Sequence, residues 1–318
     1  MGGAEAAPPN PPRSGPGVNP GPPRVLGGPL LDATEQFING LMFGCLYALI
    51  GGGFTILFGV MRRFNMAYGS TIMAGAYVAL VPVYLFRAPA WLMVLTGIAA
   101  AVLVGLLVEF CCFRFIKKGH ELAPLMTTIG MLIVINEAIV HATDAVGLKY
   151  PSPFGDVALE LGQFLVRRDY LAVLVAGVVC FTLIFLLLYR TRFGRAMRAV
   201  AERPEAAQIL GVSVRRVNVL TFVLTSALAG VIGFFAAVSV GSARPDMAFF
   251  VTGKGLVVMV LGGLGSLPGA IVGGLVLGVL EFEATWFLGA TYRDILAFVI
   301  LFLVLVFRPQ GLVGTRTT

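Results

Sequence analysis

The side chains that could carry out chemistry are few in this sequence and poorly spaced for it. The 318 residues include two histidines, His120 and His141, and four cysteines with no C-x-x-C spacing. Two histidines supply too few ligands for a usual zinc site unless carboxylates converge on them. The metalloprotease pattern H-E-x-x-H and the phosphate-binding pattern G-x-x-x-x-G-K-S/T are both missing. The sequence therefore predicts a protein that is not an enzyme, with no catalytic residue, metal site, cofactor or ATP site of its own.

The elements that must position any functional residue are membrane helices. Charged residues make up 12% of the chain, apolar residues make up 58%, and the mean hydropathy is +0.92, whereas soluble domains carry about 25% charge. A helix needs roughly 20 apolar residues to cross a bilayer. Continuous apolar runs, rather than alternating ones, exclude membrane β-strands. The runs are Phe37–Met61, Met66–Phe86, Ala90–Phe113, Leu122–His141, Tyr170–Tyr189, Val219–Val240, Gly255–Gly265, Pro268–Leu288 and Ile295–Phe307.

These runs predict an all-α, polytopic transmembrane bundle of about 8–9 spans, because Gly255–Gly265 is short for a full crossing. This run could extend back toward Val251 or form a partial, re-entrant helix. Seven arginines between residues 190 and 216 place that segment in the cytoplasm by the positive-inside rule. Alternation then puts the N-terminus outside, the C-terminus in the cytoplasm, and Lys254 and Arg293 in outer loops. We expect Glu281 and Glu283 near the outer end of their span, within reach of water. This topology also explains the net charge of +7 without a nucleic-acid partner.

Three regions of the chain differ in composition. The first 29 residues hold nine of the 18 prolines and no apolar run, so they cannot bury enough surface to offset the entropy of ordering. We predict a disordered Pro/Gly-rich tail over residues 1–36, a transmembrane domain over residues 37–312, and a C-terminal tail over residues 313–318. That domain contains a long arginine-rich loop at residues 190–216.

A short amphipathic helix is predicted inside this loop. Pro204 suits the first helical turn, Glu205 suits its positive end, and Gly211 can end it in a left-handed conformation. Ala206, Ile209 and Leu210 could then press into the groove of a partner. A solvated helix without a partner is an equally good interpretation from periodicity alone.

The pattern Glu-Ala-Ala-x-x-x-Gly in a long cytoplasmic loop resembles the coupling motif of ABC importer permeases. The segments 199–212, 220–222, 227–230, 262–270 and 307–312, with 125–130 and 151–154, are similar to LivH-like permeases of branched-chain amino acid importers. The Leu-Pro that ends the longer coupling motif of other ABC permeases is missing after Gly211. The resemblance implies ATPase coupling through Arg203, Pro204, Glu205, Ala206, Ala207, Ile209, Leu210 and Gly211.

The resemblance also implies the partners and the location. Such a permease lies in the bacterial inner membrane, pairs with a second permease (a paralogue or another copy), and docks two cytoplasmic ATPases that bind the ATP. An extracytoplasmic binding protein delivers the solute. By this resemblance, branched-chain amino acids are the first candidate for the solute, and other amino acids, urea and short amides are the alternatives. An ion-driven secondary transporter is the alternative class, but it needs central ionisable residues, and only Glu137 lies clearly within a predicted span.

Polar residues within the spans are the candidates for the solute path, because each is costly in hydrocarbon. Residues 65–69 match the family's Asn-x-Ala-x-Gly pattern, although many relatives carry His in place of Tyr68 and an acid in place of Ser70. Glu137 and His141, four residues apart, could instead satisfy each other, and helix packing is the alternative for the rest. The path candidates are Asn65, Tyr68, Ser70, Thr71, Thr127, Asn136 and Glu137.

Glycines recur at small-x-x-x-small spacing near the C-terminal end. This spacing lets helices approach closely in lipid, and the run lacks the lysine of a phosphate-binding loop. We therefore predict helix packing through Gly265, Gly269, Gly273, Gly274 and Gly278.

Overall fold

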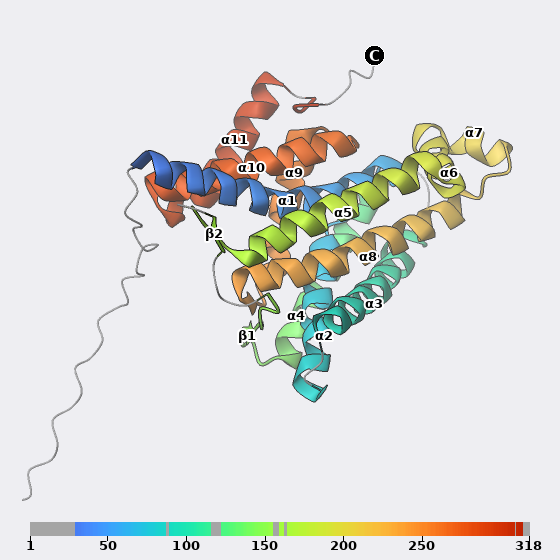
Figure 1. The fold of residues 1–318 in the computed structure, drawn as a ribbon. Coiled ribbons are helices and arrows are strands. Elements are labelled where there is room, and N and C mark those ends of the chain that lie inside the picture. The colour runs from blue at the N-terminus through green and yellow to red at the C-terminus, as the bar shows by residue number, and fades with distance from the viewer. Residues whose placement is uncertain are drawn as a thin grey trace, which may run out of the picture.

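The computed structural model describes residues 29–86, 89–115, 122–154, 159–161, 164–308 and 310–313. Within these residues the chain folds into a bundle of eleven α-helices with two small antiparallel ladders (Figure 1). A π-helix at Glu109–Phe113 extends α3, and a 3-10 turn at Ala290–Tyr292 precedes α11. The α-helices are α1 (Pro29–Met61), α2 (Tyr68–Phe86), α3 (Ala90–Val108), α4 (Ala123–Ala142), α5 (Arg168–Arg190), α6 (Arg192–Glu202), α7 (Pro204–Ile209), α8 (Val214–Val240), α9 (Met247–Gly262), α10 (Leu267–Leu288) and α11 (Arg293–Phe307).

The helices confirm a multi-pass membrane protein. Each of the nine predicted apolar runs corresponds to one helix. Two shorter apolar helices, Tyr68–Tyr84 and Met247–Gly262, accompany those that are long and apolar enough to cross a bilayer. The count of 8–9 crossings and the placement of the termini stay predictions. Among the described residues the six long helices are Ala33–Met61, Ala90–Phe113, Ala123–Ala142, Arg168–Arg190, Val214–Val240 and Leu267–Leu288.

Two predicted boundaries are wrong. Helix α1 begins at Pro29 rather than at Phe37, because proline is well suited to a first helical turn and the next residues contain no helix breaker. Residues 29–36 are therefore helical, and the rest of the predicted tail, residues 1–28, lies outside the described residues, as do residues 314–318. Helix α9 begins at Met247 and ends at Gly262, so Lys254 lies inside a helix rather than in an outer loop.

Helices α1 and α8 form the centre of the bundle. Residues Phe43 to Leu57 of α1 are buried, and α8 buries residues on every side from Thr221 to Ser239. Helices α3, α4 and α5 each leave a broad apolar face exposed. Apolar surface that faces lipid carries no hydrophobic penalty, so these faces are compatible with a membrane-spanning bundle.

The bundle has two distinct ends. Figure 1 places α6 and α7 at one end, called here the arginine-rich end, and the short strands at the other, called here the strand end. At the strand end β1 (Leu148–Lys149) pairs with β4 (Ser242–Ala243), and β2 (Leu159–Leu161) pairs with β3 (Phe164–Val166). Tyr150 follows β1 and donates its backbone N–H to Gly241 at 2.9 Å. Burial raises the pKa of the Tyr150 hydroxyl, so this side chain stays neutral.

Candidate functional site

The predicted helix in the arginine-rich loop is present as α7. It begins at Pro204 and is closed by Gly211, whose φ is +83°. The N–H of Gly211 donates to Gln208 at 3.0 Å and that of Val212 donates to Ala207 at 2.9 Å. These two bonds form a Schellman cap, which needs a left-handed residue at the position of Gly211. A β-carbon at Gly211 would meet no atom within 4 Å, so the backbone conformation, not space, accounts for the glycine.

Helix α7 has one buried side chain, Ala207, and an exposed tip formed by Ile209 and Leu210. Ala207 is 3% exposed and fixes the helix against the bundle, where α7 contacts α6 and α8. Ile209 and Leu210 are 87% and 83% exposed. Glu205 lies in the first turn and is also exposed, where a carboxylate stabilises the positive end of the helix. The tip therefore presents apolar side chains away from the bundle.

The path candidates at the start of α2 are packed inside the bundle. Asn65, Tyr68, Ser70 and Thr71 are at most 4% exposed. Ser70 and Thr71 donate hydrogen bonds to the Ala67 carbonyl at 3.0 and 2.9 Å, and the Ala67 N–H donates to Asn65 Oδ1 at 3.1 Å. The Tyr68 hydroxyl donates to the Thr225 carbonyl at 3.1 Å. These bonds satisfy the polar groups locally, and a role on the solute path stays a prediction for them.

The path candidates on α4 lie on different faces of that helix. Asn136 is 7% exposed, and its side-chain oxygen has no hydrogen-bond partner among the described residues. Thr127 and Glu137 are exposed, as are Gly130 and His141. Thr127 donates to the Ala123 carbonyl at 2.9 Å, and a β-carbon at Gly130 would meet nothing within 4 Å. Helix α4 thus has an exposed face that carries Thr127, Gly130, Glu137 and His141, called here the α4 face.

Glycines of α10 lie where other helices approach most closely. A β-carbon at Gly274 would overlap the Ala48 backbone, and one at Gly278 would overlap the Gly44 backbone. These residues therefore allow α1 and α10 to pack backbone against backbone. Gly269 and Gly273 of the same helix face α9 in the same way, since their β-carbons would meet the carbonyls of Gly262 and Val258.

Gly265 differs from the other predicted packing glycines. It lies in the turn between α9 and α10, outside both helices, with a φ of +81°. Gly265 therefore serves the turn conformation rather than a helix contact. The spacing of the glycines in the sequence does not indicate this difference. The C-terminal segment crosses the same region, because the N–H groups of Leu312 and Val313 donate to Leu261 and Gly262 at 2.8 and 3.2 Å.

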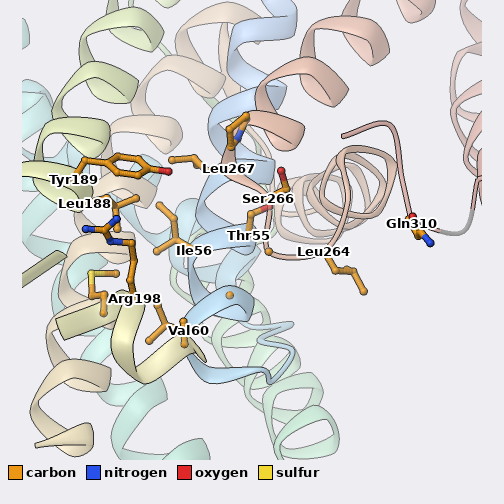
Figure 2. Close-up of a pocket in the computed structure, with 15 residues that line it drawn as sticks. Thr55, Ile56, Val60, Leu188, Tyr189, Arg198, Leu264, Ser266, Leu267 and Gln310 are labelled. Atoms are coloured by element: carbon orange, nitrogen blue, oxygen red, sulfur yellow. The ribbon is translucent and has the colours of Figure 1, made fainter. Parts of the chain in front are cut away.

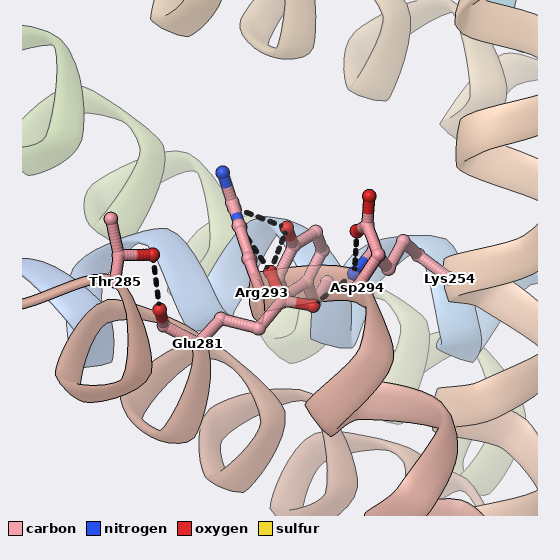
Figure 3. Close-up of polar contacts among 6 residues, drawn as sticks. Lys254, Glu281, Thr285, Arg293 and Asp294 are labelled. Atoms are coloured by element: carbon pink, nitrogen blue, oxygen red, sulfur yellow. Dashed lines mark hydrogen bonds and ion pairs between the residues drawn. The ribbon is translucent and has the colours of Figure 1, made fainter. Parts of the chain in front are cut away.

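An ion-pair cluster joins α1, α9, α10 and α11 (Figure 3). The Glu281 side chain is 1% exposed and accepts from Lys254 Nζ, from Arg293 Nε at 2.7 Å and from the Tyr47 hydroxyl at 2.6 Å. Lys254, 4% exposed, also pairs with Asp294 at 2.8 Å. Two cations thus meet two carboxylates, so every charge in the cluster has a partner.

This cluster corrects three expectations. Glu281 is not within reach of water, and Lys254 and Arg293 are not free loop residues. The argument that only Glu137 is an ionisable residue within a span is also wrong, because Lys254 and Glu281 lie inside α9 and α10. Charge counting treats each charged residue as water-facing, whereas here the charges neutralise one another. A signal was present in the sequence: Glu281 lies inside an apolar run, and Lys254, Arg293 and Asp294 lie directly before the two neighbouring runs.

The comparison with known sequences decides the family. Residues 36–305 match the family described as branched-chain amino acid transport system / permease component. The permease protein BraD of the high-affinity branched-chain amino acid transport system of Pseudomonas aeruginosa is 36% identical over 293 residues, which cover 88% of this chain and 95% of the relative. This chain belongs to that family. Its exposed helix tip and glycine-packed bundle are therefore features of a branched-chain amino acid permease component.

The permease component is also similar to other transport proteins. The permease protein LivH of Escherichia coli is 31% identical, and the alignment covers 88% of this chain and 95% of the relative. The fructose import permease protein FrcC of Rhizobium meliloti is 24% identical over 81% of this chain and 72% of the relative. Among solved structures, PsaBC from Streptococcus pneumoniae in complex with Fab superposes with a TM-score of 0.48 at 15% identity, covering 84% of this chain and 89% of that one.

Proposed function

We propose that this chain is the membrane-spanning subunit of an ABC importer that carries branched-chain amino acids into a bacterial cell across the inner membrane. Two separate ATPase subunits in the cytoplasm supply the energy. The observation that carries this proposal is α7, because its tip holds two apolar side chains that are more than four-fifths exposed at the end of the bundle richest in arginine. The residues assigned to coupling are Arg203, Pro204, Glu205, Ala206, Ala207, Ile209, Leu210 and Gly211.

A partner that covers the tip of α7 would gain from burying it. Full burial of a side chain such as Ile209 or Leu210 stabilises a complex by roughly 1.5–3 kcal/mol. The Schellman cap holds the helix in one shape before binding, which lowers the entropic cost of docking. Such an isolated apolar tip surrounded by polar residues fits the groove of a protein better than it fits water.

Movement of α7 has a route into the bundle. Ala207 packs in the main apolar core, and Val212 and Val214, which connect α7 to α8, pack against the same core. Helix α8 contacts α1, α2, α3 and α5. A push on α7 by the closing ATPases would therefore tilt the central helix and, with it, the bundle between outward-open and inward-open states.

We assign the α4 face to the second permease subunit and the solute path between the two subunits. A carboxylate is costly within the hydrocarbon region, so an exposed Glu137 is better explained by a protein or water neighbour than by lipid. Thr127 and Gly130 lie on the same face and leave room for a partner. The second subunit is a paralogue or another copy of this chain.

The carried solute is assigned from the relatives and not from a pocket. BraD and LivH are named for high-affinity branched-chain amino acid transport, which supports leucine, isoleucine and valine first. An extracytoplasmic binding protein would deliver the solute to the strand end. Urea, short amides and other amino acids serve as competitors in the uptake assay that separates these solutes.

A charge reversal at the first turn of α7 tests the coupling. Glu205→Arg places a positive charge at the positive end of the helix and should reduce the amount of ATPase that co-purifies with the permease several-fold, while the bundle still inserts. Asp246→Arg is the control, since Asp246 is 66% exposed at the strand end. Equal ATPase recovery from both variants would contradict the coupling role of α7.

A further inference from the structure

A cavity of about 600 Å³ opens at the arginine-rich end (Figure 2). Its walls come from the last turns of α1 and α5, from α6, and from the turn that precedes α10. None of the residues assigned to ATPase coupling or to the solute path lines it. The volume lies within the range of small-molecule sites, roughly 300–1,000 Å³, so the cavity is large enough for a ligand of its own.

The charge of the cavity is positive. Arg198 of α6 lines it, with its guanidinium 4.9 Å from the centre of the Tyr189 ring. No carboxylate lines the cavity, and none among the described residues forms an ion pair with Arg198. Stacking on an aromatic ring holds a guanidinium in place and leaves its N–H groups available to an anion.

The N-terminus of α10 faces the same space. Ser266 caps this 22-residue helix by accepting from the Gly269 N–H at 3.2 Å, and Ser266, Leu267 and Pro268 all line the cavity. Because Pro268 has no N–H and the Gly269 N–H is bonded to Ser266, the Leu267 N–H is the donor of the first turn that has no partner among the described residues. The positive end of the helix dipole favours negative charge at this point.

A buried hydroxyl is the second, independent sign of a ligand. Thr55 of α1 lines the cavity, is 1% exposed, and its hydroxyl has no hydrogen-bond partner among the described residues. Thr55 and Ser266 both line this cavity (Figure 2). Buried polar groups in folded proteins nearly always have a partner. The hydroxyl oxygen itself is buried, so an anionic oxygen in the cavity would accept from it after the Thr55 side chain turns toward the cavity.

We propose that the cavity binds a carboxylate or phosphate group that carries an apolar body. The oxygens would lie between Arg198, the Thr55 hydroxyl and the start of α10, and the apolar part would contact Ile56 and Leu188. Two sources share this chemistry: a free amino acid on the cytoplasmic side, which rests on the proposed function, and the headgroup region of an anionic lipid, which does not.

Occupancy of this site would act on α6. A ligand held by both Arg198 and Thr55 would bridge α6 to α1, and α6 runs through Arg203 directly into α7. The bound anion would therefore restrict the helix that leads to the docking tip. Hydrogen exchange of the α6 backbone reports this restriction without any measurement of transport.

The test uses the full-length permease with its co-purifying subunits in phosphatidylcholine nanodiscs. One arm adds L-leucine, and the other replaces part of the lipid with phosphatidylglycerol. In at least one arm, hydrogen exchange across residues 192–202 should slow several-fold. Arg198→Gln should raise the probe concentration needed for this effect by about tenfold or more, and Thr55→Val should raise it less. Arg195→Gln, on the same helix but outside the cavity, should leave it unchanged.

Two results would overturn the inference. The first is a hydrogen-exchange rate in α6 that neither probe changes. The second is the same dependence of this rate on probe concentration in the wild type, Arg198→Gln and Thr55→Val. ATP-driven leucine uptake is measured separately in the assembled importer. Uptake with an unresponsive α6 overturns this site alone, whereas a responsive α6 without amino acid uptake overturns the proposed function alone.

Discussion

Replacing Glu281 by glutamine tests whether the ion-pair cluster holds the C-terminal helices together. The substitution keeps the shape of the side chain but removes the charge that meets Lys254 and Arg293. Lys254 is 4% exposed and would keep only Asp294, which is itself 61% exposed. Breaking a buried pair by removing one partner costs about 3–5 kcal/mol. Because Asp294 still compensates Lys254 in part, we expect a loss near the lower end, about 3 kcal/mol.

Thermal unfolding in detergent measures this loss. Unfolding entropy is about 2.1 cal/mol/K per residue, so one kcal/mol shifts the midpoint of this 318-residue chain by about 1.5 °C, and Glu281→Gln should lower it by on the order of 5 °C. Asp294→Asn is the matched control, because an ion pair with a solvent-exposed partner contributes only about 0–1 kcal/mol, and its midpoint should fall much less.

A double variant separates charge pairing from packing. Lys254→Met combined with Glu281→Gln removes both buried charges of one pair, and such replacements are often close to neutral. We expect the double variant to be more stable than Glu281→Gln alone. A Glu281→Gln midpoint equal to that of the wild type, or a double variant with the summed loss of both single variants, would refute the reasoning.

Three further predictions concern the packing, the coupling helix and the α4 face. Gly274→Ala should destabilise the bundle, because its β-carbon would overlap the Ala48 backbone, whereas Gly253→Ala in α9, which has open space, should be neutral or stabilising by about 0.5–1 kcal/mol; equal thermal midpoints would contradict this. Gly211→Ala should strain the left-handed cap by about 1–2 kcal/mol, raise hydrogen exchange in α7 and weaken ATPase recovery without changing the midpoint of the bundle, and unchanged exchange would count against it. Glu137→Leu should lower amino acid uptake while leaving membrane insertion intact, and full uptake would remove the α4 face from the path.

The apolar helices and α7 could be predicted from local sequence. Continuous apolar runs indicate helices in lipid because a spanning segment must satisfy its backbone hydrogen bonds internally, and each run corresponds to a helix. Pro204 and Gly211 mark the ends of α7 because each acts through its own backbone. The spacing of Gly269, Gly273, Gly274 and Gly278 indicated close helix packing for the same local reason.

The ion-pair cluster could not be predicted in this way. Lys254 and Glu281 are 27 residues apart in the sequence, and their pairing depends on how α9 packs against α10. Charge placement by topology takes each charge alone, so it assigned Lys254 and Arg293 to water. Burial of Asn65, Tyr68, Ser70 and Thr71 has the same origin, because whether a polar side chain faces a path or a neighbouring helix is decided by tertiary packing.

The most direct test of the account is solute uptake into proteoliposomes that contain this permease with the proposed partner permease, ATPases and binding protein. We predict leucine uptake that requires ATP, the ATPases and the binding protein, and that is unaffected when proton and sodium gradients are collapsed. Leucine uptake by this chain alone, driven by a proton or sodium gradient without ATP, would contradict the central claim.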